Sequence, residues 1–181
     1  CGGLGVPTAE IAEALAAMPT VPGRFEHVDA GQDFQVIVDY AHTEDGLRNV
    51  LKGARAICSG RVICVFGCGG DRDRGKRPKM ARASAELADF TVITSDNPRT
   101  ERPESIVLEI EEGMRDAGKV RDRDYLVIVD RATAIRRAIG LAKPGDLVMI
   151  AGKGHEDYQI FGTERIHFDD REVAREVLEG R

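Results

Sequence analysis

The sequence predicts an α/β fold: a doubly wound, mostly parallel sheet of about six strands with a terminal antiparallel strand or hairpin. Two observations lead to this prediction. Short β-rich runs alternate with amphipathic segments over residues 34–178, and a single helical segment separates each strand from the next. A helical crossover between parallel strands is right-handed and covers one face of the sheet. We therefore expect helices on both faces of one Rossmann-like domain.

The first half of this domain alternates strand and helix three times. Residues 34–38, 61–66 and 90–94 are β-rich runs and predict strands. Residues 44–57 predict a helix because apolar side chains recur at helical spacing, at Leu47, Val50, Leu51, Ala54 and Ile57. An alanine-rich segment at residues 78–88 predicts the second helix. Residues 104–114 predict the third helix through one apolar stripe, made of Ile106, Val107, Ile110 and Met114.

The second half repeats the scheme. Residues 125–129 predict a strand, and Asp130 is the expected N-cap of a helix whose apolar face is Ile135, Ala138, Ile139 and Ala142. The turn Pro144-Gly145 leads into a fifth strand at residues 146–150. Residues 159–161 and 165–168 flank a glycine-containing turn and predict the hairpin. Asp169 or Asp170 then caps a last helix that ends near Leu178.

Residues 1–20 differ from the rest of the chain. Residues 8–18 predict an alanine-rich helix, and prolines and glycine in residues 19–23 predict a hinge. We interpret residues 1–20 as the tail of a preceding domain with its hinge, and residues 21–181 as one domain. The chain also begins with Cys1 rather than methionine, which we interpret as a piece of a larger protein.

Composition and charge exclude two classes of partner. The chain has 181 residues, 42% of them hydrophobic and 31% charged, and a formal net charge of −5. A negative net charge argues against nucleic acid as a partner. No apolar run approaches the roughly 18–20 residues that span a bilayer, and the start lacks the features of a signal peptide. We expect a globular protein that binds neither nucleic acid nor membrane.

The four cysteines are Cys1, Cys58, Cys64 and Cys68, and none of them forms a C-x-x-C pair. Cys64 and Cys68 could form half of a metal site, but no second pair of cysteine or histidine follows at a usable spacing. We therefore expect buried free thiols in a cytosolic protein, and no metal site within this chain.

Four polar loops follow the predicted strands, at residues 39–42, 67–77, 95–99 and 152–156. Ligands of doubly wound sheets gather beyond the carboxyl ends of the strands, so these loops are expected to form one site. The second loop contains G-x-x-x-x-G-K at residues 70–76, which is most of a phosphate-binding P-loop. Arg77 stands where a P-loop has serine or threonine to bind magnesium. The loop thus predicts a cationic rim made of Arg72, Arg74, Lys76 and Arg77, or else a solvated turn with surface charges.

The third and fourth loops predict recognition of a zwitterion. Pro98 fixes its own φ and keeps Asn97 extended, so the tetrapeptide Asp96-Asn97-Pro98-Arg99 is stiff. Its carboxylate suits an ammonium group, and its amide and guanidinium suit a carboxylate. The alternative is a turn that merely starts the next helix. In the fourth loop Glu156 could bind a second ammonium. No Ser/His/Asp or Cys/His set is present, so we assign no catalytic nucleophile.

Together these loops resemble the C-terminal domain of the Mur ligases, which form amide bonds with ATP during the synthesis of peptidoglycan precursors. The resemblance runs from about Val21 to the end of the chain and rests on five motifs in order. They are V-P-G-R-F-E (21–26), V-D-Y-A-H-T (38–43), the 67–78 loop, D-N-P-R-T-E (96–101) and A-G-K-G-H-E-D-Y-Q (151–159). Within this family, the D-N-P-R tetrapeptide indicates the ligases that add meso-diaminopimelate.

The resemblance implies roles for individual residues. Arg72 would grip a carboxylate of meso-diaminopimelate, and the same amino acid would be held by Asp96, Asn97, Pro98, Arg99, Gly152 and Glu156. Because diaminopimelate differs from lysine by one carboxylate, Arg99 would be the group that rejects lysine. Residues near ATP would be Arg24, Asp39 and His42. The P-loop, the Mg²⁺ ligands and the pocket for the UDP-N-acetylmuramoyl-dipeptide would lie in other domains, so the chain alone is expected to be inactive.

The implied reaction phosphorylates the γ-carboxylate of the D-Glu residue to an acyl phosphate, which the amine of diaminopimelate then attacks. The resemblance further implies a bacterial cytoplasmic protein, which we expect to be a monomer. Two alternatives stay open. One is a related ligase such as folylpolyglutamate synthetase, and the other is a stand-alone module that binds an amino acid or a nucleotide.

Overall fold

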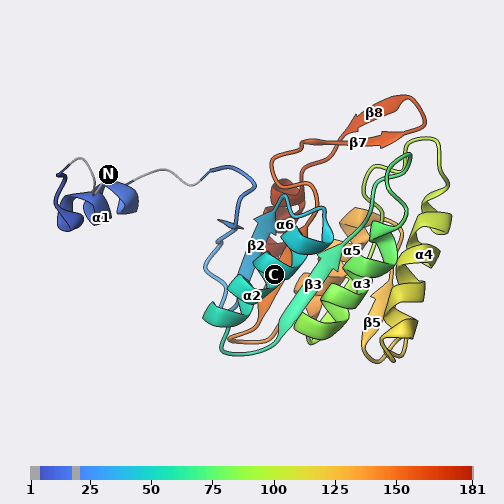
Figure 1. Ribbon diagram of the computed structural model, residues 1–181, viewed down its shortest axis with the longest axis horizontal. Helices are drawn as coiled ribbons and strands as arrows, with labels where there is room; N and C mark the ends of the chain where they lie inside the picture. Colours follow the sequence, from blue (N-terminus) through green and yellow to red (C-terminus); the bar gives the residue numbers. More distant parts are fainter. Residues whose placement is uncertain (1–4, 18–20, 181) are drawn as a thin grey trace.

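A computed structural model of the chain describes residues 5–17 and 21–180, and its main feature is a six-stranded sheet (Figure 1). In spatial order the strands are β1 (Glu26–His27), β2 (Gln35–Asp39), β6 (Leu147–Ala151), β3 (Val62–Phe66), β4 (Phe90–Ile93) and β5 (Tyr125–Val127). Strand β1 is antiparallel to β2, and all other neighbours are parallel. The predicted mostly parallel sheet is thus confirmed.

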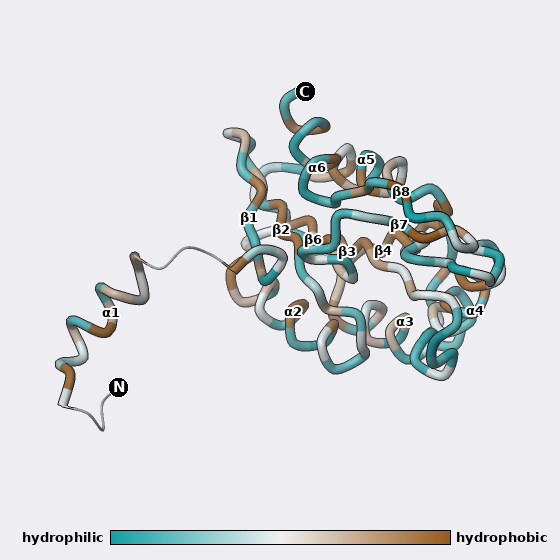
Figure 2. The backbone as a smooth tube through the Cα atoms, turned by 90° about the horizontal axis from the view of Figure 1, so that it is seen from above, coloured by the Kyte–Doolittle hydropathy of each residue, from teal (hydrophilic) through white to brown (hydrophobic). Residues whose placement is uncertain are grey.

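Helices cover both faces of this sheet, as predicted. One face packs against α2 (Glu44–Ile57), α3 (Lys76–Leu87) and α4 (Pro103–Asp116), and the other against α5 (Arg131–Leu141) and α6 (Asp170–Glu179). In Figure 2 the apolar strands lie between these two helical layers. Alternate residues of each strand enter the two cores: Cys64 belongs to the first core, and Ile63 and Val65 to the second. This alternation explains why the strands are apolar throughout.

Helices α5 and α6 begin where capping chemistry predicts. The carboxylate of Asp130 accepts a hydrogen bond from Thr133 N at the start of α5. Of the two aspartates expected before α6, Asp169 is the cap, because its side chain accepts from Arg171 N. Helix α3 begins two residues before the predicted start, and Pro78 therefore lies within its first turn, where the missing N–H costs nothing.

Two strands differ from the sequence prediction. Strand β1 was not predicted, because its two residues are too few to show any periodicity. Strand β5 ends at Val127, two residues before its predicted end. The predicted terminal hairpin is confirmed: β7 (Tyr158–Phe161) and β8 (Glu164–His167) form a two-stranded antiparallel sheet of their own (Figure 1).

The N-terminal helix α1 (Thr8–Ala16) lies apart from the sheet in Figure 1. Its predicted end at Met18, the first two residues of the predicted hinge and Cys1 fall outside the described residues. Of the remaining cysteines, Cys64 and Cys68 are buried free thiols, as expected, while Cys58 is half-buried. Burial raises the pKa of both buried thiols to about 12. Within residues 5–17 and 21–180, no helix is long and apolar enough to cross a membrane.

The strand order places the polar loops together. The chain passes from β2 to β3, continues outward to β4 and β5, and returns to insert β6 between β2 and β3. The loops after β2, β3, β4 and β6 therefore leave the same edge of the sheet, beside the point where the winding direction reverses. This is the position at which open α/β sheets bind their ligands.

Candidate functional site

A cavity of about 510 Å³ opens at this edge of the sheet. Six of the seven residues predicted to hold an amino acid line it, namely Arg72, Asp96, Asn97, Arg99, Gly152 and Glu156. His42, predicted to lie near a nucleotide, lines it as well. The lining residues that were not predicted to bind ligand are Tyr40, Thr43, Gly69, Asp73, Lys76 and Tyr158. The structure therefore brings the predicted residues into one space, while their roles in binding stay predictions.

Three predicted residues do not line the cavity. Pro98 is buried in its loop, and its carbonyl oxygen would lie 1.8 Å from a Cβ placed on Gly70, so only glycine fits there. Asp39 is buried, and its two carboxylate oxygens accept from Phe25 N at 2.7 Å and Ala41 N at 2.8 Å. Arg24 is exposed, and its guanidinium carbon lies 4.8 Å from the centre of the Tyr40 ring.

The loop after β4 is held in a specific shape by the hairpin. Arg99 has a φ of +52°, a left-handed conformation that is strained for a residue with a side chain. The hairpin compensates this strain through its backbone: Arg99 N donates to Ile160 O in β7 at 3.0 Å, and Gly162 N in the turn donates to Arg99 O at 2.7 Å. The Arg99 side chain turns toward the loop after β3 and donates to Gly70 O at 2.9 Å. This conformation brings its guanidinium to the cavity.

The loop after β3 carries a cationic rim smaller than the sequence predicted. The fully buried guanidinium of Arg77 donates to Glu101 at 2.8 and 2.9 Å and to Glu109 at 2.8 Å. Arg74 also pairs with Glu109. The predicted contribution of Arg74 and Arg77 to the rim is therefore wrong, because both are neutralised on the side of α4. Arg72 and Lys76 remain as the cations of this loop at the cavity.

The arginine at the P-loop position thus has a structural role. Glu101 accepts from Arg77 and also from the backbone N–H of Asp71, and these bonds lower its pKa to about 2. In turn, Asp71 accepts from Thr100 Oγ1 at 2.8 Å. These contacts fasten the loop after β3 to the segment that follows Arg99. The G-x-x-x-x-G-K stretch is thus held in place by ion pairs and hydrogen bonds. Arg77, which follows it, pairs with Glu101 and Glu109, whereas the residue at this position of a P-loop binds magnesium.

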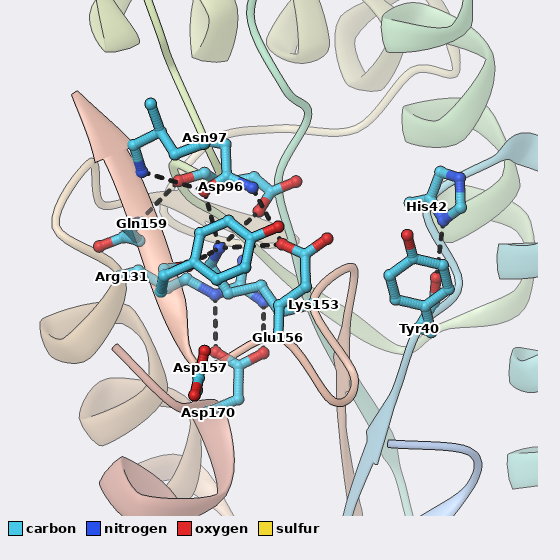
Figure 3. Close-up of polar contacts among 12 residues, drawn as sticks. Tyr40, His42, Asp96, Asn97, Arg131, Lys153, Glu156, Asp157, Gln159 and Asp170 are labelled. Carbon is cyan, nitrogen blue, oxygen red and sulfur yellow. Dashed lines mark hydrogen bonds and ion pairs between the residues drawn. The ribbon is translucent and has the colours of Figure 1, made fainter. Parts of the chain in front are cut away.

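The loop after β6 contains a site residue that the sequence reasoning missed. Lys153 is fully buried, and its ammonium lies 3.1 Å from Asp96 Oδ1 and 3.0 Å from Asn97 Oδ1 (Figure 3). Asn97 Nδ2 in turn donates to Glu156 Oε2 at 3.0 Å. Asp96 and Asn97 of one predicted motif and Glu156 of another are therefore joined around one lysine. The sequence signal for it was its place between two glycines, Gly152 and Gly154.

A second unpredicted group lies beneath these loops. Arg131 and Asp170 are both fully buried, and they form a bidentate ion pair in which both distances are 2.7 Å (Figure 3). Arg131 also donates to Ser95 O at 3.3 Å and to Ala151 O at 3.1 Å. The pair therefore ties the starts of α5 and α6 to the ends of β4 and β6. Asp170, considered as a possible cap, instead compensates a buried charge.

Aromatic rings gather at the end of β2, apart from this polar cluster in Figure 3. The centre of the Tyr40 ring lies 4.6 Å from that of His42 and 5.1 Å from that of His155. His42 Nδ1 lies 2.9 Å from Tyr40 O, which fixes the orientation of the imidazole. Arg24 lies against Tyr40, and Tyr40 and His42 line the cavity, so this aromatic cluster and its arginine stand at the β2 side of the site.

The charges at the cavity are mixed. Its lining includes the cations Arg72, Lys76 and Arg99 and the carboxylates Asp73, Asp96 and Glu156. Such a lining suits a small ligand that carries both signs of charge, because each ligand group can meet a partner of the opposite sign.

Residues 23–154 match the family described as Mur ligase, glutamate ligase domain. The chain is 57% identical over 177 residues to the UDP-N-acetylmuramoyl-L-alanyl-D-glutamate--2,6-diaminopimelate ligase of Syntrophomonas wolfei, covering 98% of this chain and 36% of that protein. It is 58% identical to the ligase of the same name from Synechocystis sp., covering 97% of this chain and 34% of that protein. The chain thus spans about a third of the length of these relatives.

Two solved structures have similar folds. A structure of a UDP-N-acetylmuramoyl-L-alanyl-D-glutamate--2,6-diaminopimelate ligase is 38% identical, with a TM-score of 0.81, and the match covers 99% of this chain and 36% of that one. A folylpolyglutamate synthase from Mycobacterium tuberculosis is 20% identical, with a TM-score of 0.64 and coverage of 97% of this chain and 36% of that one. The second likeness shows a shared fold only.

Proposed function

Because the chain belongs to the Mur ligase family, we propose that it is the amino-acid-binding, C-terminal domain of a ligase that adds meso-diaminopimelate to UDP-N-acetylmuramoyl-L-Ala-D-Glu. The names of its relatives support this reaction, and their identity to this chain extends over nearly all of it. In this proposal, the relatives' greater length corresponds to the domains that bind ATP and the nucleotide sugar.

The observation that carries the proposal is the cavity lined by two guanidinium groups and three carboxylates. One end of diaminopimelate bears an ammonium and a carboxylate on the same carbon. Asp96 and Glu156 would accept from that ammonium, while Arg72 and Arg99 would donate to the carboxylate. Gly152 has a φ of +124°, so its backbone can adopt the turn that brings Glu156 back to the cavity.

The same arrangement explains a preference over lysine. Lysine has a hydrogen where diaminopimelate has its second carboxylate. Bound lysine would leave Arg99, which is half-buried and faces the cavity, without its anionic partner. A site built to bind a polar group rejects an analogue that lacks this group by roughly 10⁴-fold or more. We therefore assign Arg99 as the residue that selects diaminopimelate.

In the proposed reaction, the γ-carboxylate of the D-Glu residue takes the terminal phosphoryl group of ATP, which forms an acyl phosphate and releases ADP. The amine of diaminopimelate attacks the acyl carbon, the amide bond forms and phosphate leaves. This chain would hold the far end of diaminopimelate, so that the attacking amine points out of the cavity toward the other domains. Such positioning contributes by lowering the entropic cost of bringing the two substrates together.

Of the three residues predicted to lie near ATP, two are placed where they can reach a nucleotide and one is not. Arg24 is exposed beside Tyr40, and His42 lines the cavity, so both can reach a nucleotide at the domain surface. Asp39 uses both carboxylate oxygens on backbone N–H groups, and we assign it to holding Phe25 and Ala41 in place. Among the residues that the structure describes, no group of three His, Cys, Asp or Glu side chains could hold a metal ion, and we assign none of them to Mg²⁺.

An amino-acid screen tests the proposal. The full-length ligase that contains this chain is supplied with ATP, Mg²⁺ and UDP-N-acetylmuramoyl-L-Ala-D-Glu, and phosphate release is measured with meso-diaminopimelate, L-lysine or L-ornithine. We expect diaminopimelate to be preferred over lysine by at least about 100-fold, a conservative bound for rejection of an analogue without the recognised group. Equal or faster turnover with lysine would contradict the assignment.

A further inference from the structure

Lys153 lies in the turn after β6, and two glycines let its side chain point into the domain. Gly152 and Gly154 have φ values of +124° and +54°, which are favourable only for glycine. A Cβ on Gly154 would lie 2.6 Å from Gly23 O and 2.7 Å from Tyr40 Cβ, so the turn packs closely against the end of β2. A lysine in a polar loop is normally solvated. Here the backbone conformation buries it completely.

The ammonium of Lys153 is surrounded by acceptors. It lies 2.6 Å from Tyr158 O, 3.0 Å from Asn97 Oδ1, 3.1 Å from Asp96 Oδ1 and 3.7 Å from Glu156 Oε2 (Figure 3). Three N–H groups therefore face four oxygen atoms of the protein. Two of its three N–H groups donate to Tyr158 O and Asn97 Oδ1, and Lys153 does not line the cavity. Any effect on binding must act through its neighbours.

The first neighbour is Asn97, whose amide orientation is fixed. Its Oδ1 accepts from Lys153 Nζ at 3.0 Å and from Ile160 N at 3.1 Å. Both partners are donors only, so the amide oxygen must face them and the NH₂ group must face the other way. This NH₂ group donates to Glu156 Oε2 at 3.0 Å, at the cavity that both residues line. Asn97 thus offers a ligand N–H donors and no acceptor.

The second effect of Lys153 is on charge. Among the described residues, Lys153 is the one cation within ion-pair distance of both Asp96 and Glu156. Arg131, buried below them, is already compensated by Asp170. Two carboxylates and one ammonium leave one net negative charge, which a single ligand ammonium can neutralise. Without Lys153, the two carboxylates would lose their shared cation and would repel each other.

We propose that Lys153 is the positioning residue that sets the selectivity of this site. It holds the Asn97 amide so that its NH₂ group faces a ligand carboxylate. It also reduces the combined charge of Asp96 and Glu156 to −1, which one ligand ammonium neutralises. The inference rests on the proposed function, since the ligand it concerns is diaminopimelate. It explains why a lysine that cannot touch the ligand stands at the centre of the residues predicted to bind it.

Lys153→Met in the full-length ligase tests this inference, since methionine keeps much of the side-chain volume and removes the charge. We expect the KM for diaminopimelate to rise at least tenfold, while the KM for ATP stays within twofold and kcat within threefold. We also expect the preference for diaminopimelate over lysine to fall at least tenfold, because Asp96 and Glu156 would lose their shared cation and their added negative charge would repel the carboxylate that lysine lacks. A purely structural role would not change that preference.

Arg61→Met is the matched control. Arg61 pairs with the buried Asp146 at the opposite end of the sheet, so its loss removes a similar ion pair far from the cavity. We expect it to lower the melting temperature and leave the amino-acid preference unchanged. Lys153→Gln, which keeps one donor group, serves if the methionine variant does not fold, with the same expected loss of preference.

The outcomes separate the two proposals. Folded Lys153 variants with unchanged KM and preference for diaminopimelate would overturn the inference, as would an equal loss for diaminopimelate, lysine and ATP. A wild-type ligase that does not use diaminopimelate would instead refute the proposed function.

Discussion

Replacing Asp170 by asparagine should destabilise the domain strongly, because it leaves Arg131 with a buried and unpaired charge. Both side chains of the pair are 0% exposed, and the carboxylate accepts two bonds of 2.7 Å from the guanidinium. Asparagine has nearly the same shape, but its NH₂ group would face guanidinium donors. The two carbonyl oxygens of Ser95 and Ala151 are then the remaining partners of Arg131.

The size of the effect follows from this geometry. Removing one partner of a buried pair costs about 3–5 kcal/mol in the free energy of unfolding. For a domain of this length, each kcal/mol lowers the melting temperature by about 2–4 °C, so we expect a decrease of about 6–20 °C. Asp157→Asn is the control, because Asp157 and Arg165 form an ion pair whose side chains are both 62% exposed. Such surface pairs contribute about 0–1 kcal/mol.

Urea and thermal unfolding of the 181-residue chain, followed by circular dichroism, measure both variants. The double variant Arg131→Met with Asp170→Leu should recover at least half of the loss, because it removes the buried charge along with its partner. If Asp170→Asn costs less than about 1 kcal/mol, the pair behaves like a surface pair, and burial of the unpaired Arg131 charge does not carry the expected cost.

Three further predictions concern the loops. Arg99→Ala in the full-length ligase should lower kcat/KM for diaminopimelate at least about 100-fold and leave the KM for ATP unchanged, since Arg99 is assigned to the amino acid alone; unchanged kinetics would refute this role. The 181-residue chain alone should hydrolyse no ATP above the buffer rate, because Arg77 is occupied by glutamates, and clear turnover would overturn that interpretation. Arg77 lowers the pKa of Glu101 from 4.5 to about 2, so the stabilisation is complete above pH 4.5 and is lost as pH falls toward 2. Glu101→Gln should therefore flatten the dependence of stability on pH between about 5 and 2, and a curve parallel to the wild type would contradict the coupling.

The sheet and its helices could be predicted from the sequence because their signals are local. Apolar spacing identified α2, and side-chain capping identified the start of α5 at Asp130. The two-residue strand β1 has no such local signal, since it forms only by pairing with β2. Placement of the polar loops at one edge also followed, because parallel strands end on the same side.

The directions of buried charged side chains could not be predicted in the same way. Arg77 pairs with residues 24 and 32 positions away, and Lys153 contacts Asn97 at a separation of 56. A loop lysine or arginine has no local feature that distinguishes burial from solvation. The cationic rim was therefore predicted too large, and the lysine at the centre of the site was missed.

The way in which β7 holds the loop after β4 limits how this hairpin can diverge among homologues. Most of its contacts with that loop come from main-chain atoms of Ile160 and Gly162, with Gln159 as the exception through its side-chain amide. Amino-acid replacements at Phe161, which is 40% exposed, would leave these contacts in place. A one-residue insertion or deletion within β7 would turn these main-chain groups to the other side of the strand and release Arg99. Alignment gaps should therefore be confined to the tip of the hairpin, even where its composition drifts freely.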